Sequence, residues 1–147
     1  MLFIQTILFP TDFSDHSERA LELARALARD YGARLVLLHV AAPPELASEA
    51  ALVFRVWFEQ AELKRKLRRL VAAHANLRPE HCFEQGDAAA EILRVAREER
   101  ADLIVMGTHG RTGLGRLLMG SVAEQVLRRA PCPVLTVKKS SSETTSG

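Results

Sequence analysis

Residues 101–107 have the sequence Ala-Asp-Leu-Ile-Val-Met-Gly, from which the fold class can be inferred. Every residue from Leu103 to Met106 is apolar, and the run is bounded by Asp102 and Gly107. A short run that is apolar at each position is typical of a strand buried on both faces, whereas alternation of apolar and polar residues indicates a sheet with one solvated face. We therefore expect Leu103–Met106 to be a strand of a parallel sheet.

Strand and helix patterns alternate along the rest of the chain. The other runs with strand character are Leu2–Phe9, Leu35–Val40, His81–Gln85 and Val134–Val137. Helical spacing and capping residues mark the segments from Ser14 or Asp15 to Tyr31, from about Ser48 to Ala75, after Gly86-Asp87, and from Ser121 to Arg129. This alternation predicts an α/β fold, a single doubly wound domain whose five-stranded parallel sheet has helices on both faces.

The second of these helices carries two apolar stripes. The earlier stripe is Phe54, Trp57, Phe58 and Ala61, and the later one is Leu63, Leu67, Leu70 and Val71. We expect the aromatic stripe to pack in the core, because amphipathic stripes usually pack on their own sheet. The shift between the stripes indicates a bend or a change in what the helix packs on.

Length and composition indicate one globular domain. The chain has 147 residues, of which 48% are apolar and 26% charged, which is not the profile of a disordered or fibrous protein. Residues 140–147 include no apolar side chain that could be buried. We expect a folded unit over residues 1–139 and a disordered tail over 140–147.

Charge and cysteine content argue against several classes of protein. The 20 Lys and Arg residues nearly balance the 18 Asp and Glu residues, so a dedicated nucleic-acid binder is not expected. Charges interrupt every apolar stretch before it reaches the length of a membrane span, and no secretory signal pattern is present. Cys82 and Cys132 are too few for a disulfide framework, and the histidines lack the spacing of metal ligands. We expect a cytoplasmic protein without a metal site of its own.

Two strand ends carry residues suited to binding an anionic ligand. In an open parallel sheet, ligands bind beyond the carboxyl ends of the strands. Pro10-Thr11-Asp12 follows the first strand, and a glycine-punctuated segment follows Met106 and ends at Gly120-Ser121-Val122, where a helix begins. Glycines let backbone N–H groups approach phosphate oxygens, and a helix N-terminus favours an anion. The residues alone leave two interpretations open, a phosphate cradle or a glycine-rich turn with Ser121 as a helix cap.

Two familiar nucleotide motifs are absent. Gly113-Leu114-Gly115 lacks the third glycine of G-x-G-x-x-G, because position 118 is Leu. The lysine of the G-x-x-x-x-G-K-[ST] motif is missing as well. The catalytic apparatus of a P-loop NTPase is therefore not expected.

The spacing of the glycines resembles that of a known family. Gly107-x-x-Gly110, followed by nine residues and Gly120-Ser121, is similar to the G-x2-G-x9-G-[ST] signature of the ATP-binding universal stress proteins. Pro10-Thr11-Asp12-Phe13-Ser14 resembles their N-terminal motif, and the likeness extends from Phe3 to Lys138. The resemblance implies a Rossmann-like domain of the adenine nucleotide alpha-hydrolase type.

The resemblance also implies a ligand, its contacts and a partner. The ligand is ATP, with Mg²⁺, and the partner is a second copy joined through the last strand, Val134–Val137. Adenine and ribose would lie along Pro10, Thr11 and Asp12, with Val40 against the base. Ribose and phosphates would be followed by Met106, Gly107, His109, Gly110, Gly120, Ser121 and Val122. Independently of the resemblance, Arg111 and Arg116 are cations of the same segment that can neutralise phosphate charge. Ala123 departs from many relatives, which have Thr or Ser at this position.

The function implied is that of a nucleotide-dependent binding module in a stress response. Two alternatives stay open on the sequence. One is a slow ATPase or autophosphorylating enzyme with Thr108, Thr112 or Ser121 as phosphate acceptor, although no base accompanies them beyond Asp12. The other is a dimeric scaffold that binds no nucleotide.

Overall fold

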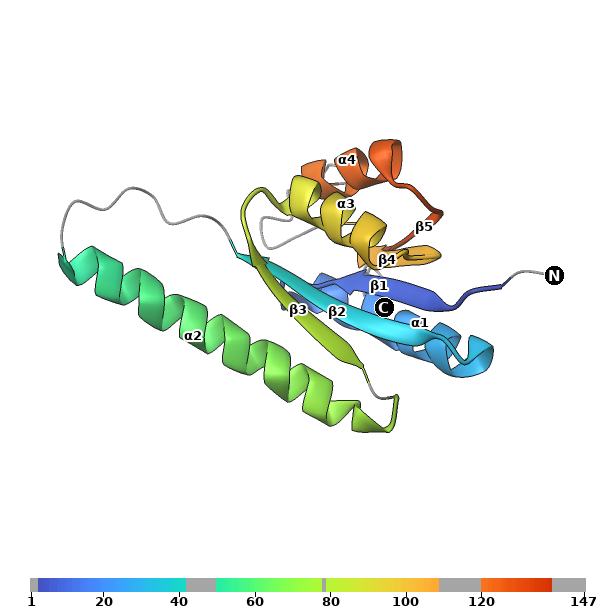
Figure 1. Cartoon of the computed structure of the whole chain (residues 1–147), viewed down its shortest axis with the longest axis horizontal. Helices are drawn as coiled ribbons and strands as arrows, with labels where there is room; N and C mark the ends of the chain where they lie inside the picture. The colour runs from blue at the N-terminus through green and yellow to red at the C-terminus, as the bar shows by residue number, and fades with distance from the viewer. Residues whose placement is uncertain (1–2, 42–49, 78, 109–119, 139–147) are drawn as a thin grey trace, which may run out of the picture.

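The computed structural model of the chain describes residues 3–41, 50–77, 79–108 and 120–138 (Figure 1). Within these ranges the strands are β1 (Thr6–Pro10), β2 (Arg34–Ala41), β3 (Glu80–Gln85), β4 (Leu103–Gly107) and β5 (Val134–Val137). The α-helices are α1 (Asp15–Tyr31), α2 (Ala50–Ala73), α3 (Ala88–Glu98) and α4 (Ser121–Arg129), and a 3₁₀-helix η1 spans Ala75–Leu77. The predicted α/β fold with a five-stranded parallel sheet is confirmed.

The sheet reverses its direction of growth at β1. The strand order is β3-β2-β1-β4-β5, so the chain builds outward from β1 to β3 and then returns to the other side of β1 with β4. β1 pairs with β2 and with β4, and Leu8 lies opposite Val36 on one side and Ile104 on the other. The boundary between β1 and β4 is therefore the point where the strand order reverses, which is where ligands bind in folds of this kind.

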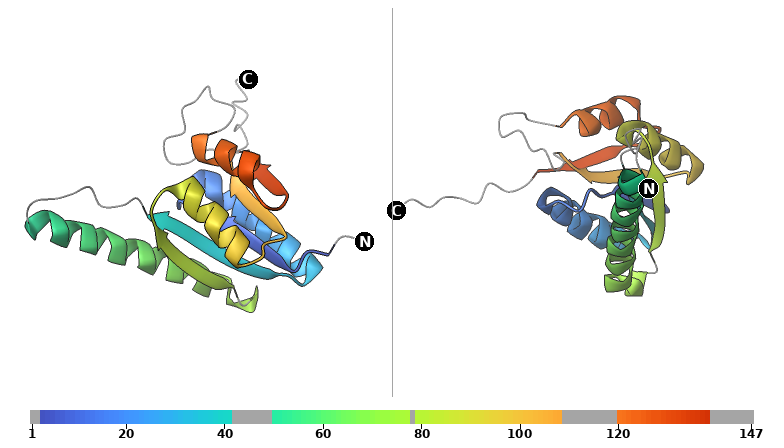
Figure 2. Two further views of the ribbon diagram at one scale, coloured as in Figure 1. Left: turned by 45° about the horizontal axis from the view of Figure 1, so that its top comes forward. Right: turned by 90° about the vertical axis from the view of Figure 1, so that its left-hand side faces the viewer.

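Successive residues of the strands enter two separate cores. On one face Ile7 and Phe9 pack with Ala24 of α1 and Leu67 of α2. On the other face Leu8 packs with residues of α3 and α4. Figure 2 shows the helices α1 and α2 on one side of the sheet and α3 and α4 on the other. Because side chains of a strand alternate between faces, a strand that is apolar throughout supplies both cores.

The first strand begins later than its apolar run predicts. Leu2 lies outside the described residues, and β1 starts at Thr6. The backbone amides of Gln5 and Thr6 donate to the Asp102 carboxylate at 2.9 and 3.0 Å. On the side of β4 a side chain thus takes the place of a strand partner at the entry to β1, and regular pairing begins there at Ile7, whereas pairing with β2 begins at Thr6.

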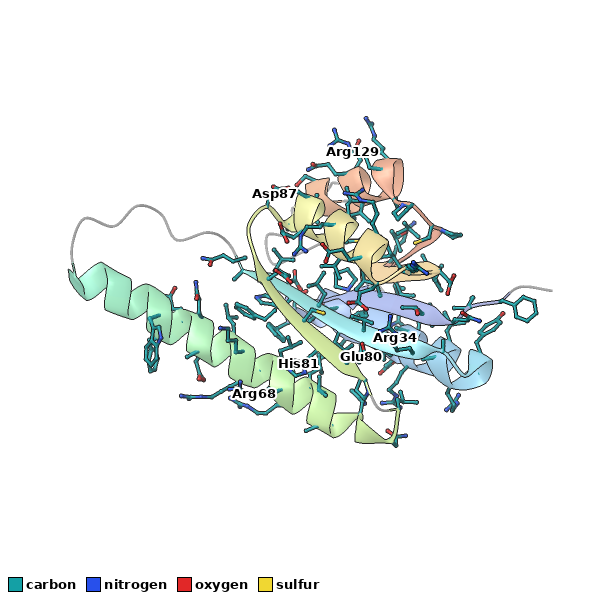
Figure 3. The ribbon with its side chains drawn as sticks, in the orientation of Figure 1. Arg34, Arg68, Glu80, His81, Asp87 and Arg129 are labelled. Carbon is teal, nitrogen blue, oxygen red and sulfur yellow. The ribbon has the colours of Figure 1, made fainter. Side chains whose placement is uncertain are left out.

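The helices α1 and α3 begin after residues predicted as caps, whereas the N-cap of α4 is Gly120 and not Ser121. Ser14 is the N-cap of α1, and Gly32 ends this helix in the left-handed conformation with a φ of 63°. Asp87 precedes α3 and accepts a hydrogen bond from the Ala90 amide at 3.0 Å. Figure 3 shows Asp87 at the start of α3. The same figure shows Arg34 of β2 near Glu80 of β3, and the Arg34 guanidinium donates a hydrogen bond to the Glu80 carboxylate at 2.8 Å.

The prediction that the aromatic stripe of α2 packs in the core is wrong for the residues that can be checked. The side chain of Phe54 lies outside the described residues, Trp57 is 64% exposed and Phe58 is 52% exposed. These two side chains are exposed because α2 is longer than the strand beside it. A helix of 24 residues spans about 36 Å, whereas the six residues of the neighbouring strand β3 span about 20 Å. The first half of α2 therefore projects beyond the sheet (Figure 1), and the side chains of α2 described in the core, such as Leu67, come from its second half.

Leu67 is the anchor of this packed half, with 1% of its surface exposed. We expect Leu67→Ala to lower the free energy of unfolding by about 2–5 kcal/mol, because it removes buried methyl groups and leaves a cavity. Leu127→Ala is a matched control on α4, since Leu127 is 40% exposed, and should cost less than about 1 kcal/mol. Urea unfolding followed by circular dichroism measures both, and equal losses would contradict the anchoring role.

Candidate functional site

A cleft opens at the carboxyl ends of β1 and β4, where the strand order reverses. It has a volume of about 170 Å³. Its lining comes from the strand ends of β1, β2 and β4 and from the first turns of α1, α3 and α4. The lining residues are Pro10, Thr11, Asp12, Ser17, Leu38, Val40, Ala88, Ile92, Met106, Gly107, Thr108, Gly120, Ser121, Val122 and Ala123.

Most of the residues predicted to hold a ligand meet in this cleft. Those that line it are Pro10, Thr11, Asp12, Val40, Met106, Gly107, Gly120, Ser121 and Val122. His109, Gly110 and Arg111 lie outside the described residues. Segments separated by about a hundred residues are therefore neighbours, because parallel strands that end at one edge of the sheet bring their following loops together.

Sequence reasoning missed several lining residues. These are Ser17, Leu38, Ala88 and Ile92. Ala88 and Ile92 belong to the first turns of α3, a helix whose sequence shows only a cap and a buried face. Their presence in the cleft depends on α3 packing beside α4, which no local pattern of residues indicates. Thr108, a phosphate acceptor in the enzyme alternative, and Ala123, where many relatives have Thr or Ser, also line the cleft.

One side of the cleft is apolar. Leu38, Val40, Ile92 and Met106 contribute aliphatic or thioether surface from three different elements. Leu38 and Met106 are buried, and Val40 packs partly against the same core. A floor of this kind suits a flat, weakly polar ring, because ligand clefts bind such groups mainly through apolar contact.

The turn between β1 and α1 places one carboxylate at the cleft. Asp12 Oδ1 accepts a hydrogen bond from the Ser17 hydroxyl at 2.6 Å and from the Ser14 amide at 2.9 Å. Burial alone raises the pKa of Asp12, but the hydrogen bonds from Ser14 and Ser17 outweigh it, and the net pKa lies below its usual 3.8. Asp12 is therefore ionised at neutral pH and is a strong acceptor for hydroxyl groups.

The start of α4 faces the cleft from the other side. Gly120 is the N-cap, and its lack of a side chain means that the cap contributes no side-chain acceptor. The amides of Ser121, Val122 and Ala123 stand at the N-terminus, where an α-helix has no carbonyl of its own to bind them. The Gly120 amide donates to the Thr108 carbonyl at 2.7 Å, which fixes this terminus to the end of β4. The arrangement favours an anion such as a phosphate group.

The described parts of the chain contain neither a cluster of metal ligands nor a helix suited to a membrane. Among these residues there is no group of three or more His, Cys, Asp or Glu side chains placed to hold a metal ion. No helix in the same ranges has the length and apolarity that crossing a membrane requires. Asp12 is the one charged side chain among the described residues of the cleft.

The lowered pKa of Asp12 predicts a pH-dependent contribution to stability. Its ionised form stabilises the fold above pH 3.8, and this stabilisation is lost as the pH falls below 3.8 through the pKa of the folded state. We expect Asp12→Asn to reduce the free energy of unfolding by about 1 kcal/mol at pH 7, since a neutral amide oxygen accepts the same hydrogen bonds more weakly and solvent screens the half-buried charge.

Urea unfolding at pH 7 and at pH 3 measures this contribution, and the difference between wild type and Asp12→Asn should shrink at the lower pH. Asp30→Asn is the control, because Asp30 is exposed at the end of α1, and it should change stability by less than about 0.5 kcal/mol. A difference at Asp12 that is the same at both pH values would contradict the interpretation.

Comparison with known proteins identifies the group to which this fold and cleft belong. The model of the universal stress protein family matches residues 4–138. A universal stress protein of Thermus aquaticus is 41% identical over 142 residues, which cover 91% of this chain and 98% of the relative. The structure of MJ0577 from Methanocaldococcus jannaschii superposes with a TM-score of 0.87 at 31% identity, covering 96% of this chain and all of that one.

A third similar protein was solved with a ligand. It is a universal stress protein in complex with cAMP, which superposes with a TM-score of 0.69 at 28% identity and covers 92% of this chain and 98% of its own. The sequence identities, the coverage of both chains and the superpositions agree with one another. This chain belongs to the universal stress protein family.

Proposed function

We propose that this chain binds ATP in the cleft between β1 and β4 and acts as a nucleotide-dependent binding module of the cytoplasmic stress response. The observation that carries the proposal is the convergence of three kinds of surface. The apolar floor suits adenine, ionised Asp12 suits ribose hydroxyls, and the N-terminus of α4 suits phosphate. The cAMP complex of a similar universal stress protein supports the choice of an adenine nucleotide.

In this proposal each part of the nucleotide has its own partners. The base lies against Val40 and Met106, and the sugar lies beside Thr11 and Asp12. The phosphates lie at Gly120, Ser121 and Val122. His109, Gly110 and Arg111 are predicted to complete the phosphate side, although they lie outside the described residues.

A Mg²⁺ ion fits this arrangement as a companion of the phosphates. Mg²⁺ keeps several waters and commonly binds through phosphate oxygens and one or two carboxylates. The described residues contain no preformed metal cluster, and Asp12 is the one carboxylate among the described residues that line the cleft. The ion would therefore arrive with the nucleotide and offset its negative charge.

We favour binding over hydrolysis as the function. Asp12 is the one titratable side chain among the described residues of the cleft, and hydrogen bonds from Ser14 and Ser17 stabilise its ionised form. These bonds weaken it as a base, because a lowered pKa reduces the affinity for a proton. The described residues of the cleft therefore favour binding over a slow ATPase, although Thr108 and Ser121 are among them. A scaffold that binds no nucleotide would not explain why the three surfaces converge.

Calorimetric titration with ATP, in the presence and absence of Mg²⁺, tests the proposal. We expect saturable binding, and a hundredfold excess of ATP over its Kd should stabilise the fold by about 2.7 kcal/mol. Asp12→Ala should weaken binding about tenfold or more, because it removes the charged acceptor for the sugar. Asp30→Ala is the matched control, since Asp30 lies at the far end of α1. Flat titrations with ATP, ADP and AMP would reject the proposal.

We further propose a homodimer formed through β5. This strand is the last of the described sheet, and Leu135 in it is 37% exposed. An apolar strand at the end of a sheet is a ready surface for pairing with another chain. A two-fold interface between identical strands would bury Leu135 against its own copy.

Sedimentation velocity at micromolar concentration tests the dimer. We expect wild-type protein to sediment as a dimer and Leu135→Glu to shift it to monomer, because two negative charges would meet at the interface. Phe58→Glu is the control, since Phe58 is 52% exposed on the projecting half of α2. A monomeric wild-type protein would rule out the dimer. A dimer that is broken by Phe58→Glu and not by Leu135→Glu would place the interface on α2.

A further inference from the structure

His39 lies beneath the cleft without lining it. It stands in β2 between Leu38 and Val40, which both face the cleft. Because side chains alternate along a strand, the imidazole points to the opposite face of the sheet. There it is 6% exposed and contacts Phe13 and Phe83, which pack against the core formed with α1 and α2.

The imidazole is hydrogen-bonded to the backbone of the β1–α1 turn. His39 Nδ1 lies 2.8 Å from the Thr11 carbonyl oxygen. A carbonyl oxygen only accepts hydrogen bonds, so Nδ1 carries a proton and donates it. The Thr11 amide in turn donates to the Leu38 carbonyl at 2.8 Å. β2 therefore holds Thr11 by both its N–H and its C=O group.

The same imidazole supports a strained residue in this turn. Phe13 has a φ of 63°, a left-handed conformation that is an outlier for a bulky side chain. Its ring lies on the His39 ring, with centroids 4.6 Å apart, and Lys66 of α2 places its Nζ 6.0 Å from the centroid of the Phe13 ring. Strained backbone of this kind persists where surrounding contacts hold it in place.

The left-handed step at Phe13 determines where the cleft residues of the turn lie. It places the Ser14 amide where this group donates to Asp12 Oδ1 at 2.9 Å, and the amide of Phe13 itself donates to Thr11 Oγ1 at 3.0 Å. Both side chains that the turn brings to the cleft are thus tied to backbone whose path depends on Phe13. Support for Phe13 is therefore support for Thr11 and Asp12.

We propose that His39 is a positioning residue that holds the turn of Thr11, Asp12 and Phe13 in the geometry that binds the adenosine part of the nucleotide. The proposal rests on the proposed function and adds to it a residue that never touches the ligand. Its effect reaches the base and sugar alone, because the phosphates lie at α4. Loss of His39 therefore lowers the affinity for adenosine and the affinity for ATP by the same factor.

The matched pair His39→Asn and His39→Leu separates the hydrogen bond from the packing. Asn and Leu have nearly the same shape, both lose the imidazole ring, and only Asn retains an N–H group at the position of Nδ1. We expect His39→Leu to lower the affinities for adenosine and for ATP about tenfold each. His39→Asn should lower both affinities less, because it keeps the N–H donor. Titrations are done at a temperature where circular dichroism shows each variant to be folded.

Ser121→Ala supplies the contrasting pattern. Ser121 stands at the N-terminus of α4 on the proposed phosphate side. Loss of its hydroxyl should therefore lower the affinity for ATP and leave the affinity for adenosine unchanged. A His39→Leu variant that binds adenosine within twofold of wild type would overturn the proposal. A His39→Leu variant with weakened ATP binding but normal adenosine binding would overturn it as well.

Amide hydrogen exchange of the ligand-free protein tests the inference independently of nucleotide binding. We expect His39→Leu to accelerate exchange at the Phe13 and Ser14 amides about tenfold or more, while Ile7 and Leu8 in β1 keep their protection. Unchanged exchange at the turn would overturn the positioning role. If wild-type protein binds no nucleoside, the proposed function fails, and the exchange rates still decide whether His39 holds the turn.

Discussion

The parallel pairing of β1 with β4 is the constraint on which the rest of the structure depends. Ile7 lies opposite Leu103 and Leu8 opposite Ile104, although these residues are almost a hundred positions apart. Because the two strands run in the same direction, the turn after β1 and the segment after β4 leave the sheet at the same edge. The helices that follow, α1 and α4, start on opposite faces of the sheet, and the space between their first turns is the cleft.

The cleft combines groups whose chemistry does not depend on large formal charge. The side proposed for phosphate consists of backbone amides at the start of α4, and the side proposed for the sugar holds one carboxylate, Asp12. The near balance of acidic and basic residues in the whole chain therefore says little about the ligand. A helix N-terminus and a hydrogen-bonded aspartate create strong local fields of opposite sign within one small volume. Such a pair of fields orients a ligand that is anionic at one end and carries hydroxyl groups at the other.

The sequence was most informative where a local interaction decides the structure. Gly32 ends α1 because its φ is positive, and Asp87 starts α3 because its side chain accepts an amide hydrogen bond three residues later. The meeting of Asp12 with Ser121 was also predictable, since every parallel strand delivers its carboxyl end to the same edge. These features follow from residue chemistry and from the direction of the strands alone.

Features that depend on how elements pack were beyond the reach of the sequence. The contribution of Ala88 and Ile92 to the cleft requires α3 to lie beside α4, and the contact between His39 and Phe13 requires β2 to pass under the β1–α1 turn. The exposure of Trp57 depends on α2 being longer than the sheet that it covers. Periodicity shows which face of a helix is apolar but not how far its neighbour extends, and the strand next to α2 is known only once the strand order is known.

The position of Trp57 makes intrinsic tryptophan fluorescence a probe of the surface of α2. It is the sole tryptophan of the sequence, it is 64% exposed, and it lies on the part of α2 that projects beyond the sheet. Its fluorescence emission is therefore sensitive to solvent at the helix surface and does not come from the cleft. A blue shift of that emission reports contact of another molecule with α2, whereas filling of the cleft is read from the heat of binding. Two events at separate places on one small domain can thus be followed by two separate signals, without any label.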